Sequence, residues 1–316
     1  MKSLSGGAPA ATLTPAAPAR SALVLAFASI YVIWGSTYLA IRVAIETMPG
    51  FLMAGVRFVT AGALLYAWSR WRGAPRPTLQ QWRPNLVIGI LLLLGGNGLV
   101  VWAEQFVPSG ITALIIGAQP LFFVITEWLW PGGTRPTAIT FGALLLGFAG
   151  VAWLAAPWRA GSGAGFDLAG VGAILTACAS WALGSIYARH ARHGVDPMLA
   201  SSLQMIAGGA ALCLLAWAHR DFAHVDVTAF SARSWTAFVY LIFFGSIVGF
   251  STFVWLLKHS TPARVATYAY VNPIVAVALG ALILHEPVTG RTVIASAVII
   301  GAVIVISTDK NRPRSR

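Results

Sequence analysis

Two apolar stretches of this 316-residue chain each carry an amide followed by a proline near the middle. Gln119-Pro120 lies within IIGAQPLFFVITEW, and Asn272-Pro273 lies within AYVNPIVAVALGAL. Because proline has no N–H, the carbonyls four residues earlier, those of Ile116 and Ala269, lose their helical partners. Lipid cannot satisfy a bare carbonyl, so such breaks are tolerated against protein or a wet cavity. The two pairs therefore predict helix breaks at the prolines beside a polar cavity, and the alternative is two packing kinks with satisfied amides.

Arg57 is the most deeply placed charge, two or three residues from the centre of another membrane-length segment. A charge at that depth is costly and indicates a functional residue by default. One interpretation is that Arg57 binds a carboxylate or phosphate of a ligand. The other, which we favour from sequence, is that it pairs with Glu46, Glu104 or main-chain carbonyls and holds helices together. Its counterpart in the second half is Gln204, which also forms hydrogen bonds.

Aromatic side chains and a further amide lie away from the expected membrane interfaces. The aromatic residues of YVIWGSTYLAIR (31–42) share one helical face, and in ASWALGSIYARH (179–190) Trp181 and Ser185 share another. Such residues suit a pocket for a partly apolar ligand, although they also suit a core or a lipid-facing surface. Asn97, between glycines in LLGGNGLVVW, suits a cavity or a hydrogen bond between helices. The candidate cavity residues are Trp34, Tyr38, Asn97, Gln119, Trp181, Ser185, Tyr268 and Asn272.

The elements that must position these residues are membrane spans. Hydrophobic residues make up 58% of the chain and charged residues 9%, whereas a soluble domain has about a quarter charged residues. A spanning helix needs about 20 apolar residues, and long unbroken apolar runs exclude the alternating strands of a β-barrel. The sequence predicts an all-α integral membrane protein with ten spans: 22–41, 50–69, 84–103, 109–130, 137–156, 168–188, 197–217, 234–256, 263–284 and 290–307.

The net charge of +12 is explained by topology and not by nucleic acid. If the N-terminus is cytoplasmic, fifteen Lys and Arg residues lie on the side of the termini and five lie on the other side. This bias agrees with the positive-inside rule, with both termini cytoplasmic. The arginines at 70–83 are then topology determinants that contact anionic lipid. We expect a lipid bilayer and a small molecule as partners, and no nucleic acid.

The two halves of the chain resemble each other. Gly35 and Tyr38 match Gly184 and Tyr187 at an offset of 149 residues, and at an offset of 153 Gly96, Trp102 and Pro120 match Gly249, Trp255 and Pro273. Five helices are an odd number, so the second copy enters the membrane from the opposite side. Inverted repeats with interrupted helices are typical of secondary transporters, and a purely structural membrane protein is the alternative. The expected organisation is a disordered tail (1–21), a first repeat (22–156), a Gly-rich linker (157–167), a second repeat (168–307) and a basic tail (308–316).

Several chemistries find little support. His190 and His193 have metal-like spacing without suitable partners, the chain has no phosphate-binding glycine loop, and no nucleophile–base grouping indicates a hydrolase. We therefore expect no enzyme activity, metal or cofactor. No acidic residue is expected near the midplane, so proton coupling would use Glu104 or Glu127, or the protein would be a facilitator.

The motifs WGSTYLAIR (34–42), MAGVRF (53–58), GAQP (117–120), YVNP (270–273) and HEP (285–287), together with the duplicated unit, resemble the EamA type of the drug/metabolite transporter superfamily. The resemblance covers about residues 22–307 and is greatest for an inner-membrane branch. It implies a ten-helix bacterial inner-membrane carrier with two EamA domains that exports amino acids, metabolites or toxic compounds. One departure is the loop PGGTRP (131–136), which lacks the acid that family first halves often carry.

The sequence as a whole predicts a secondary transporter that works by alternating access on a small amphipathic metabolite, such as an amino acid or a drug-like compound. A facilitator or channel, a structural membrane protein and a membrane-embedded enzyme are the alternatives. The oligomeric state, the direction of transport and the coupling ion stay open.

Overall fold

The protein is described here by a computed structural model that covers residues 19–133, 135–155, 167–191, 194–260 and 267–309. Within these ranges every regular element is a helix. Nearly all of the predicted N-terminal tail (1–21), linker (157–167) and C-terminal tail (308–316) lies outside the described residues.

Nine helical stretches within the described residues are long and apolar enough to cross a membrane. They are α1 (Arg20–Ala44), α2 (Gly50–Trp71), α3 to α4 (Leu79–Ala103), α5 to α6 (Ser109–Leu129), α7 (Ala138–Ala155), α8 (Leu168–His190), α9 (Pro197–Ala218), α10 into α11 (Ala232–Phe253) and α14 (Gly290–Thr308). The tenth expected span is represented by α13 (Tyr268–Ile283), whose apolar part, Val271–Ile283, is shorter. The prediction of an all-α membrane fold is confirmed.

The third span of each half has the same composite build. In the first half α3 (Leu79–Gly89) continues into the π-helical segment η1 (Ile90–Gly98) and then into α4 (Leu99–Ala103). In the second half α10 (Ala232–Tyr240) continues into the π-helical segment η5 (Leu241–Val248) and then into α11 (Gly249–His259). π-helical turns are rare and often mark functional sites, so their presence at corresponding places supports an internal duplication.

The two amide–proline pairs behave differently in the structure. In the first half α5 (Ser109–Ile116) ends before Gly117, and α6 (Gln119–Leu129) begins two residues later with Pro120 in its first turn, so this span is interrupted as predicted. In the second half α13 runs through Pro273 without a break. The prediction of a break at Pro273 is therefore wrong for the described residues. A proline inside a helix removes one main-chain hydrogen bond, and the rest of α13 continues around it.

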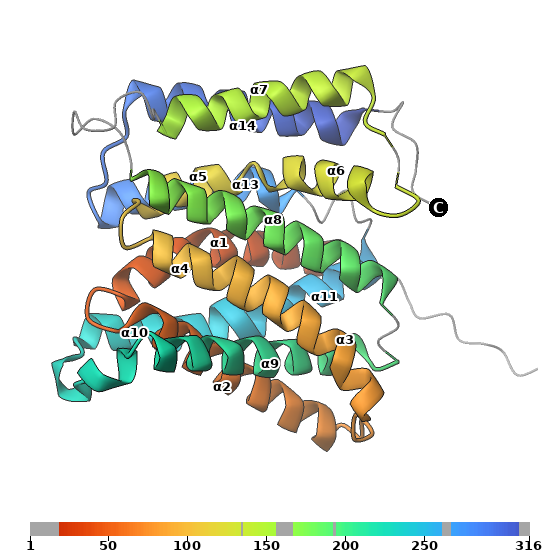
Figure 1. The fold of residues 1–316 in the computed structure, drawn as a ribbon, viewed down its shortest axis with the longest axis vertical. Coiled ribbons are helices and arrows are strands. Elements are labelled where there is room, and N and C mark those ends of the chain that lie inside the picture. The colour runs from red at the N-terminus through yellow and green to blue at the C-terminus, as the bar shows by residue number, and fades with distance from the viewer. Residues whose placement is uncertain (1–18, 134, 156–166, 192–193, 261–266, 310–316) are drawn as a thin grey trace, which may run out of the picture.

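Helices of one half pack on helices of the other half throughout the bundle. The second spans, α2 and α9, lie together at one end of the long axis, and the fifth spans, α7 and α14, lie together at the opposite end (Figure 1). Between these pairs α1 packs on α13 and on the α10–η5–α11 span, while α8 packs on α6 and on the α3–η1–α4 span. Each first helix therefore contacts the third and fourth spans of the opposite half.

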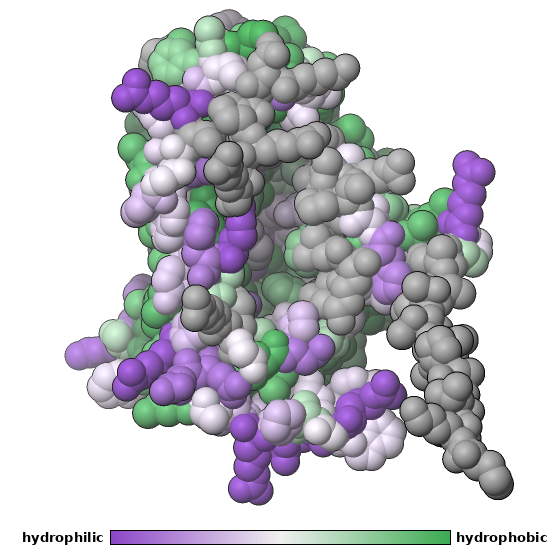
Figure 2. Space-filling model, turned by 90° about the vertical axis from the view of Figure 1, so that its right-hand side faces the viewer, coloured by the Kyte–Doolittle hydropathy of each residue, from purple (hydrophilic) through white to green (hydrophobic). Residues whose placement is uncertain are grey.

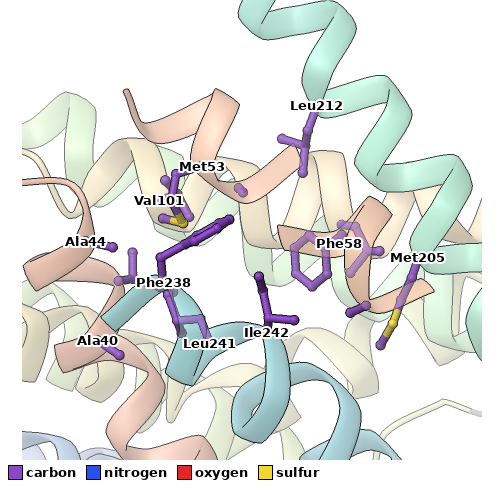
Figure 3. Close-up of a cluster of buried hydrophobic side chains, with 14 of the residues drawn as sticks. Ala40, Ala44, Met53, Phe58, Val101, Met205, Leu212, Phe238, Leu241 and Ile242 are labelled. Atoms are coloured by element: carbon purple, nitrogen blue, oxygen red, sulfur yellow. The ribbon is translucent and has the colours of Figure 1, made fainter. Parts of the chain in front are cut away.

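Glycines allow the closest approaches between the halves. A Cβ atom on Gly208 of α9 would lie 2.4 Å from the carbonyl oxygen of Gly89 on α3, and one on Gly209 would lie 2.7 Å from the amide nitrogen of Val59 on α2. Both are backbone-to-backbone contacts that leave no room for a side chain. Around them is a hydrophobic cluster with members from α1, α2, α4, α9, α10 and η5, including Phe58 and Leu212 (Figure 3). Close approach through small residues is the usual means of packing helices in membranes.

Candidate transport cavity

A cavity of about 280 Å³ lies between the two halves. Its wall draws on α1, α2, η1, α4, α5, α6, α8, η5, α11, α13 and α14. Ile116 and Ala269, whose carbonyls the two prolines leave without helical partners, both line it. The structure brings seven of the eight candidate residues to this wall: Trp34, Tyr38, Asn97, Gln119, Trp181, Tyr268 and Asn272.

Ser185 is the candidate that is not among the described residues lining the cavity. It follows Gly184 of α8, and a Cβ atom on Gly184 would lie 2.8 Å from the Leu91 side chain of η1. At this level α8 is in close contact with η1, and the partly exposed Ser185 side chain lies outside the cavity wall.

Each half contributes an indole that reaches across to the other half. The Trp34 ring of α1 packs on Gly249 of α11, where an added Cβ would lie 2.5 Å from its Nε1 atom. The Trp181 ring of α8 packs on Gly96 of η1, where an added Cβ would lie 2.8 Å from its Cε3 atom. Gly96 and Gly249 are the residues that the 153-residue offset pairs in the sequence. The two indoles therefore occupy related places on opposite sides of the repeat interface.

Trp34 also anchors an aromatic wall. Its ring centroid lies 5.0 Å from that of Tyr268, 5.2 Å from that of Phe253 and 6.2 Å from that of Phe250. The Trp34–Tyr268 pair is edge-to-face, a favoured geometry for aromatic rings. This cluster joins α1 of the first half to α11 and α13 of the second half.

The two amides beside the prolines also cross the interface. The Gln119 side chain donates from Nε2 to the carbonyl oxygen of Cys178 on α8 at 2.8 Å. The Asn272 amide nitrogen, in the orientation that satisfies its neighbours, donates to the carbonyl oxygens of Tyr31 on α1 and Tyr268, each at 3.2 Å. Each amide thus ties its span to the first helix of the opposite half. The amides are used for helix–helix bonding while their residues also form part of the cavity wall.

Arg57 is 3% exposed and lines the cavity. Its Nε atom donates to the Ser246 hydroxyl of η5 at 3.0 Å, and its guanidinium lies 4.6 Å from the Phe58 ring centroid. Its Nη1 atom is buried and has no hydrogen-bond partner among the described residues. The structure therefore shows a tie to Ser246 in place of the expected pairing with Glu46 or Glu104. Gln204, its sequence counterpart, instead donates to Asn85 on α3 at 2.9 Å.

The acidic residues lie outside the described cavity wall. Glu46 forms an exposed pair with Arg233 at 3.8 Å, and Glu127 pairs with Arg189 at 3.1 Å near the opposite end of the bundle. Glu104 follows α4 and is fully buried, and neither of its carboxyl oxygens has a hydrogen-bond partner among the described residues. Its main-chain carbonyl accepts a hydrogen bond from Arg42 of α1.

The bundle is hollowed on the side where the described chain ends. Ile306 and Ser307, close to the C-terminal end of α14, line the cavity. Figure 2 views the molecule from this side and shows hydrophilic residues around a central recess. The cavity wall thus extends from the repeat interface toward the C-terminal end of α14.

Thr37, Phe123 and Phe250 are among the wall residues that were not anticipated from sequence. The 153-residue offset would have found Phe250, because it carries Asn97 to that position. Helical spacing would have found Phe123, which lies one turn after Gln119. No group of three or more metal-ligating side chains occurs within the described ranges, so the geometry offers no metal-binding cluster there.

Two sets of helices that meet across a central cavity define an integral membrane transport protein. The chain belongs to the EamA-like transporter family, whose model matches residues 21–156 and again residues 168–308. Its members are transporters and not enzymes. The two matches account for the paired helices and amides, because each half of the molecule matches the same family model.

Relatives along nearly the whole chain carry transporter names. "Uncharacterized inner membrane transporter YedA" of Escherichia coli (strain K12) is 36% identical over 284 residues, which are 89% of either chain. "Uncharacterized transporter YvbV" of Bacillus subtilis (strain 168) is 29% identical over 92% of either chain. "Probable amino-acid metabolite efflux pump" of Escherichia coli (strain K12) is 26% identical over 88% of this chain and 90% of its own. One crystal structure shares the fold with a TM-score of 0.63, at 22% identity and covering 91% of this chain and 98% of its own.

Proposed function

We propose that this protein is a secondary transporter that exports a small amphipathic metabolite, such as an amino acid or a drug-like compound, by alternating access. The observation that carries the proposal is the cavity at the repeat interface, where an indole and an amide from each half cross to the other half. A site built from both halves changes its exposure when one half rocks against the other. The mixture of indoles and amides suits a ligand with an apolar body and polar groups.

Counterflow tests this proposal. In proteoliposomes preloaded with unlabelled L-phenylalanine, a site that alternates exchanges internal for external substrate, so uptake of tritiated L-phenylalanine is expected to accelerate several-fold. Uptake through a channel does not accelerate when the vesicles are preloaded. If preloading accelerates uptake of none of the amino acids in a broader panel, the carrier mechanism is rejected. The same vesicles with and without a pH gradient test coupling, because identical rates exclude protons as the coupling ion.

Substitution of Asn272 by leucine tests the cavity itself. The change removes the donor to Tyr31 and Tyr268, and a lost hydrogen bond with one buried partner costs about 1–3 kcal/mol. Transport is expected to fall about tenfold at normal membrane abundance. The control is Ile274→Leu, which changes an exposed neighbour on the same helix. Equal transport by both variants would remove Asn272 from the site.

The proposed location is the bacterial inner membrane with both termini in the cytoplasm. The basic-residue bias and the inner-membrane name of one relative support it. Green fluorescent protein fused after Arg316 is expected to fluoresce, and alkaline phosphatase fused there is expected to be inactive. Phosphatase inserted after Thr228, in the exposed connection between α9 and α10, is expected to be active. The reverse pattern would place the termini outside.

A further inference from the structure

The cavity wall holds one kind of charge. Among the described residues that line the cavity, Arg57 is the only Asp, Glu, Lys, Arg or His residue. A buried cation without an ionic partner is costly in a low-dielectric site, where burial disfavours the charged form and an opposite charge restores it. The cavity therefore lacks one negative charge that a ligand can supply.

The guanidinium is held in place by contacts that leave a buried donor group unused. The Ser246 hydroxyl donates to the carbonyl oxygen of Leu241 at 3.0 Å, so it presents a lone pair to Arg57 Nε. The Phe58 ring lies against one face of the guanidinium. These contacts fix the orientation of the group, and the Nη1 atom remains buried and unpartnered within the described structure. Planar guanidinium donors match the oxygens of a carboxylate or phosphate.

The nearest described acid does not replace such a ligand. Glu104, which lies just beyond the span Leu79–Ala103, is close enough for its charge to act on Arg57, but the two side chains form no ion pair. Burial, and then the charge of Glu286, raise the pKa of Glu104 well above its usual range. The guanidinium of Arg57 therefore has no ion-pair partner among the described residues.

A second unused group lies on the same wall. The Oδ1 atom of Asn97 is buried and has no hydrogen-bond partner among the described residues. An acceptor in that state favours a ligand that also carries an N–H or O–H donor. Around both polar groups the wall is aromatic and aliphatic, with Trp34, Trp181 and Phe250 among its members.

From this geometry we infer that Arg57 is the anion-binding residue of the cavity, and that the transported compound is a small carboxylate with a hydrogen-bond donor and an apolar body. An α-amino acid with an apolar side chain has this chemistry. The inference rests on the proposed transport function and deepens it by naming the substrate class. A phosphate offers a related set of acceptor oxygens, but the small, mostly apolar cavity favours the less hydrated carboxylate.

Matched pairs of compounds test the inference. Proteoliposomes are loaded with equimolar L-phenylalanine and L-phenylalaninamide, L-leucine and L-leucinamide, and 3-phenylpropionate and its amide, together with phenyl phosphate, and release is followed by mass spectrometry. A hydrogen bond to a charged group contributes about 1.5–3 kcal/mol, so at about 1.4 kcal/mol per factor of ten the wild type is expected to prefer the carboxylate of at least one pair by about 10- to 100-fold. Equal release of amide and acid, preferential release of phenyl phosphate, or release of no carboxylate would overturn it.

The variants assign the preference to Arg57. Arg57→Gln is expected to lose the discrimination, Arg57→Lys is expected to keep part of it, and Ser246→Ala is expected to raise the KM for the carboxylate because the guanidinium is no longer oriented. Arg42→Gln, which removes a cation outside the described wall, is the control. If Arg57→Gln does not fold, Ser246→Ala and Arg57→Lys still decide the matter, because unchanged discrimination and KM in both would reject the role. The counterflow test is independent of the acid–amide comparison. A carrier of uncharged compounds would show counterflow but would not prefer the carboxylate of any pair.

Discussion

Replacement of Gly208 by leucine is expected to abolish the accumulation of folded protein. The Cβ atom alone would lie 2.4 Å from the carbonyl oxygen of Gly89 and 2.6 Å from the Cβ atom of Leu93. The first of these is a backbone atom, so α9 must separate from α3 before any side chain fits. Overpacking in a core whose side chains can partly adjust costs about 1–3 kcal/mol. A clash with a backbone atom leaves less room for adjustment, so the expected cost for Gly208→Leu is larger.

The measurement is the size-exclusion profile and melting temperature of a detergent-purified fluorescent fusion. Gly301→Leu is the matched control, because Gly301 also lies within a helix and a Cβ atom there would meet nothing within 4 Å. The control is expected to match the wild type, and Gly208→Leu is expected to aggregate or to be degraded. A monodisperse Gly208→Leu protein with a melting temperature within a few degrees of wild type would show that α3 and α9 do not meet in this way.

Removal of the Glu286 carboxylate is expected to destabilise one end of the bundle. This is the end where α13 finishes and α5 begins. Glu286 follows α13, and its two carboxyl oxygens accept hydrogen bonds from the Ser109 amide and hydroxyl at 2.8 Å and from the Gly110 amide at 2.9 Å. These donors belong to the first turn of α5, where a negative charge is also favoured by the helix dipole. The carboxylate therefore joins the second half to the first.

The turn after α13 holds this carboxylate in place. His285 has a φ of 55°, in the left-handed region, and the Glu286 amide donates to the carbonyl oxygen of Gly280 at 3.1 Å, so the chain turns back on the end of α13. A Cβ atom on Gly280 would lie 2.4 Å from the Glu286 Oε2 atom, so glycine leaves the room that the carboxylate fills. The corresponding loop of the first half, PGGTRP, has no acidic residue.

Glu286→Ala is expected to lower the melting temperature by roughly 3–12 °C. The estimate takes about 1.5–3 kcal/mol for hydrogen bonds to a charged group and about 2–4 °C per kcal/mol. Glu286→Gln is expected to have a smaller effect, because it keeps one acceptor oxygen. Glu46→Ala is the control, since its exposed pair with Arg233 contributes little. Equal melting temperatures for Glu286→Ala and the wild type would contradict a structural tie at this position.

The sequence predicted the membrane fold and much of the cavity for one physical reason. In a chain that is 58% hydrophobic, a polar side chain in the middle of a span is costly, so groups such as Asn97, Gln119 and Asn272 stand out against their surroundings. The structure places all three at the cavity wall. Their role in binding a substrate stays a prediction until the transport tests are made.

One of the misses was readable in the sequence, and two were not. Phe250 is one of many aromatic residues in this chain, but the 153-residue offset that pairs it with Asn97 distinguishes it from the others. Ser185 shares a helical face with Trp181, yet only Trp181 of the two lines the cavity. Pro273 was expected to break its span, yet α13 is continuous there. The last two depend on how neighbouring helices meet, which local patterns do not specify.

The wide turns of η1 and η5 give these two spans room to lose a residue. A π-helical turn accommodates one residue more than an α-helical turn, so a single-residue deletion within η1 is absorbed when the segment becomes α-helical. The same deletion in a regular α-helix rotates everything after it by about 100°, from 3.6 residues per turn. Val100, which follows η1, would keep its place on the cavity face. Tolerance to single-residue deletion should therefore be higher in these two segments than in the other spans, and a deletion scan would reveal two tolerant windows at corresponding places in the two halves.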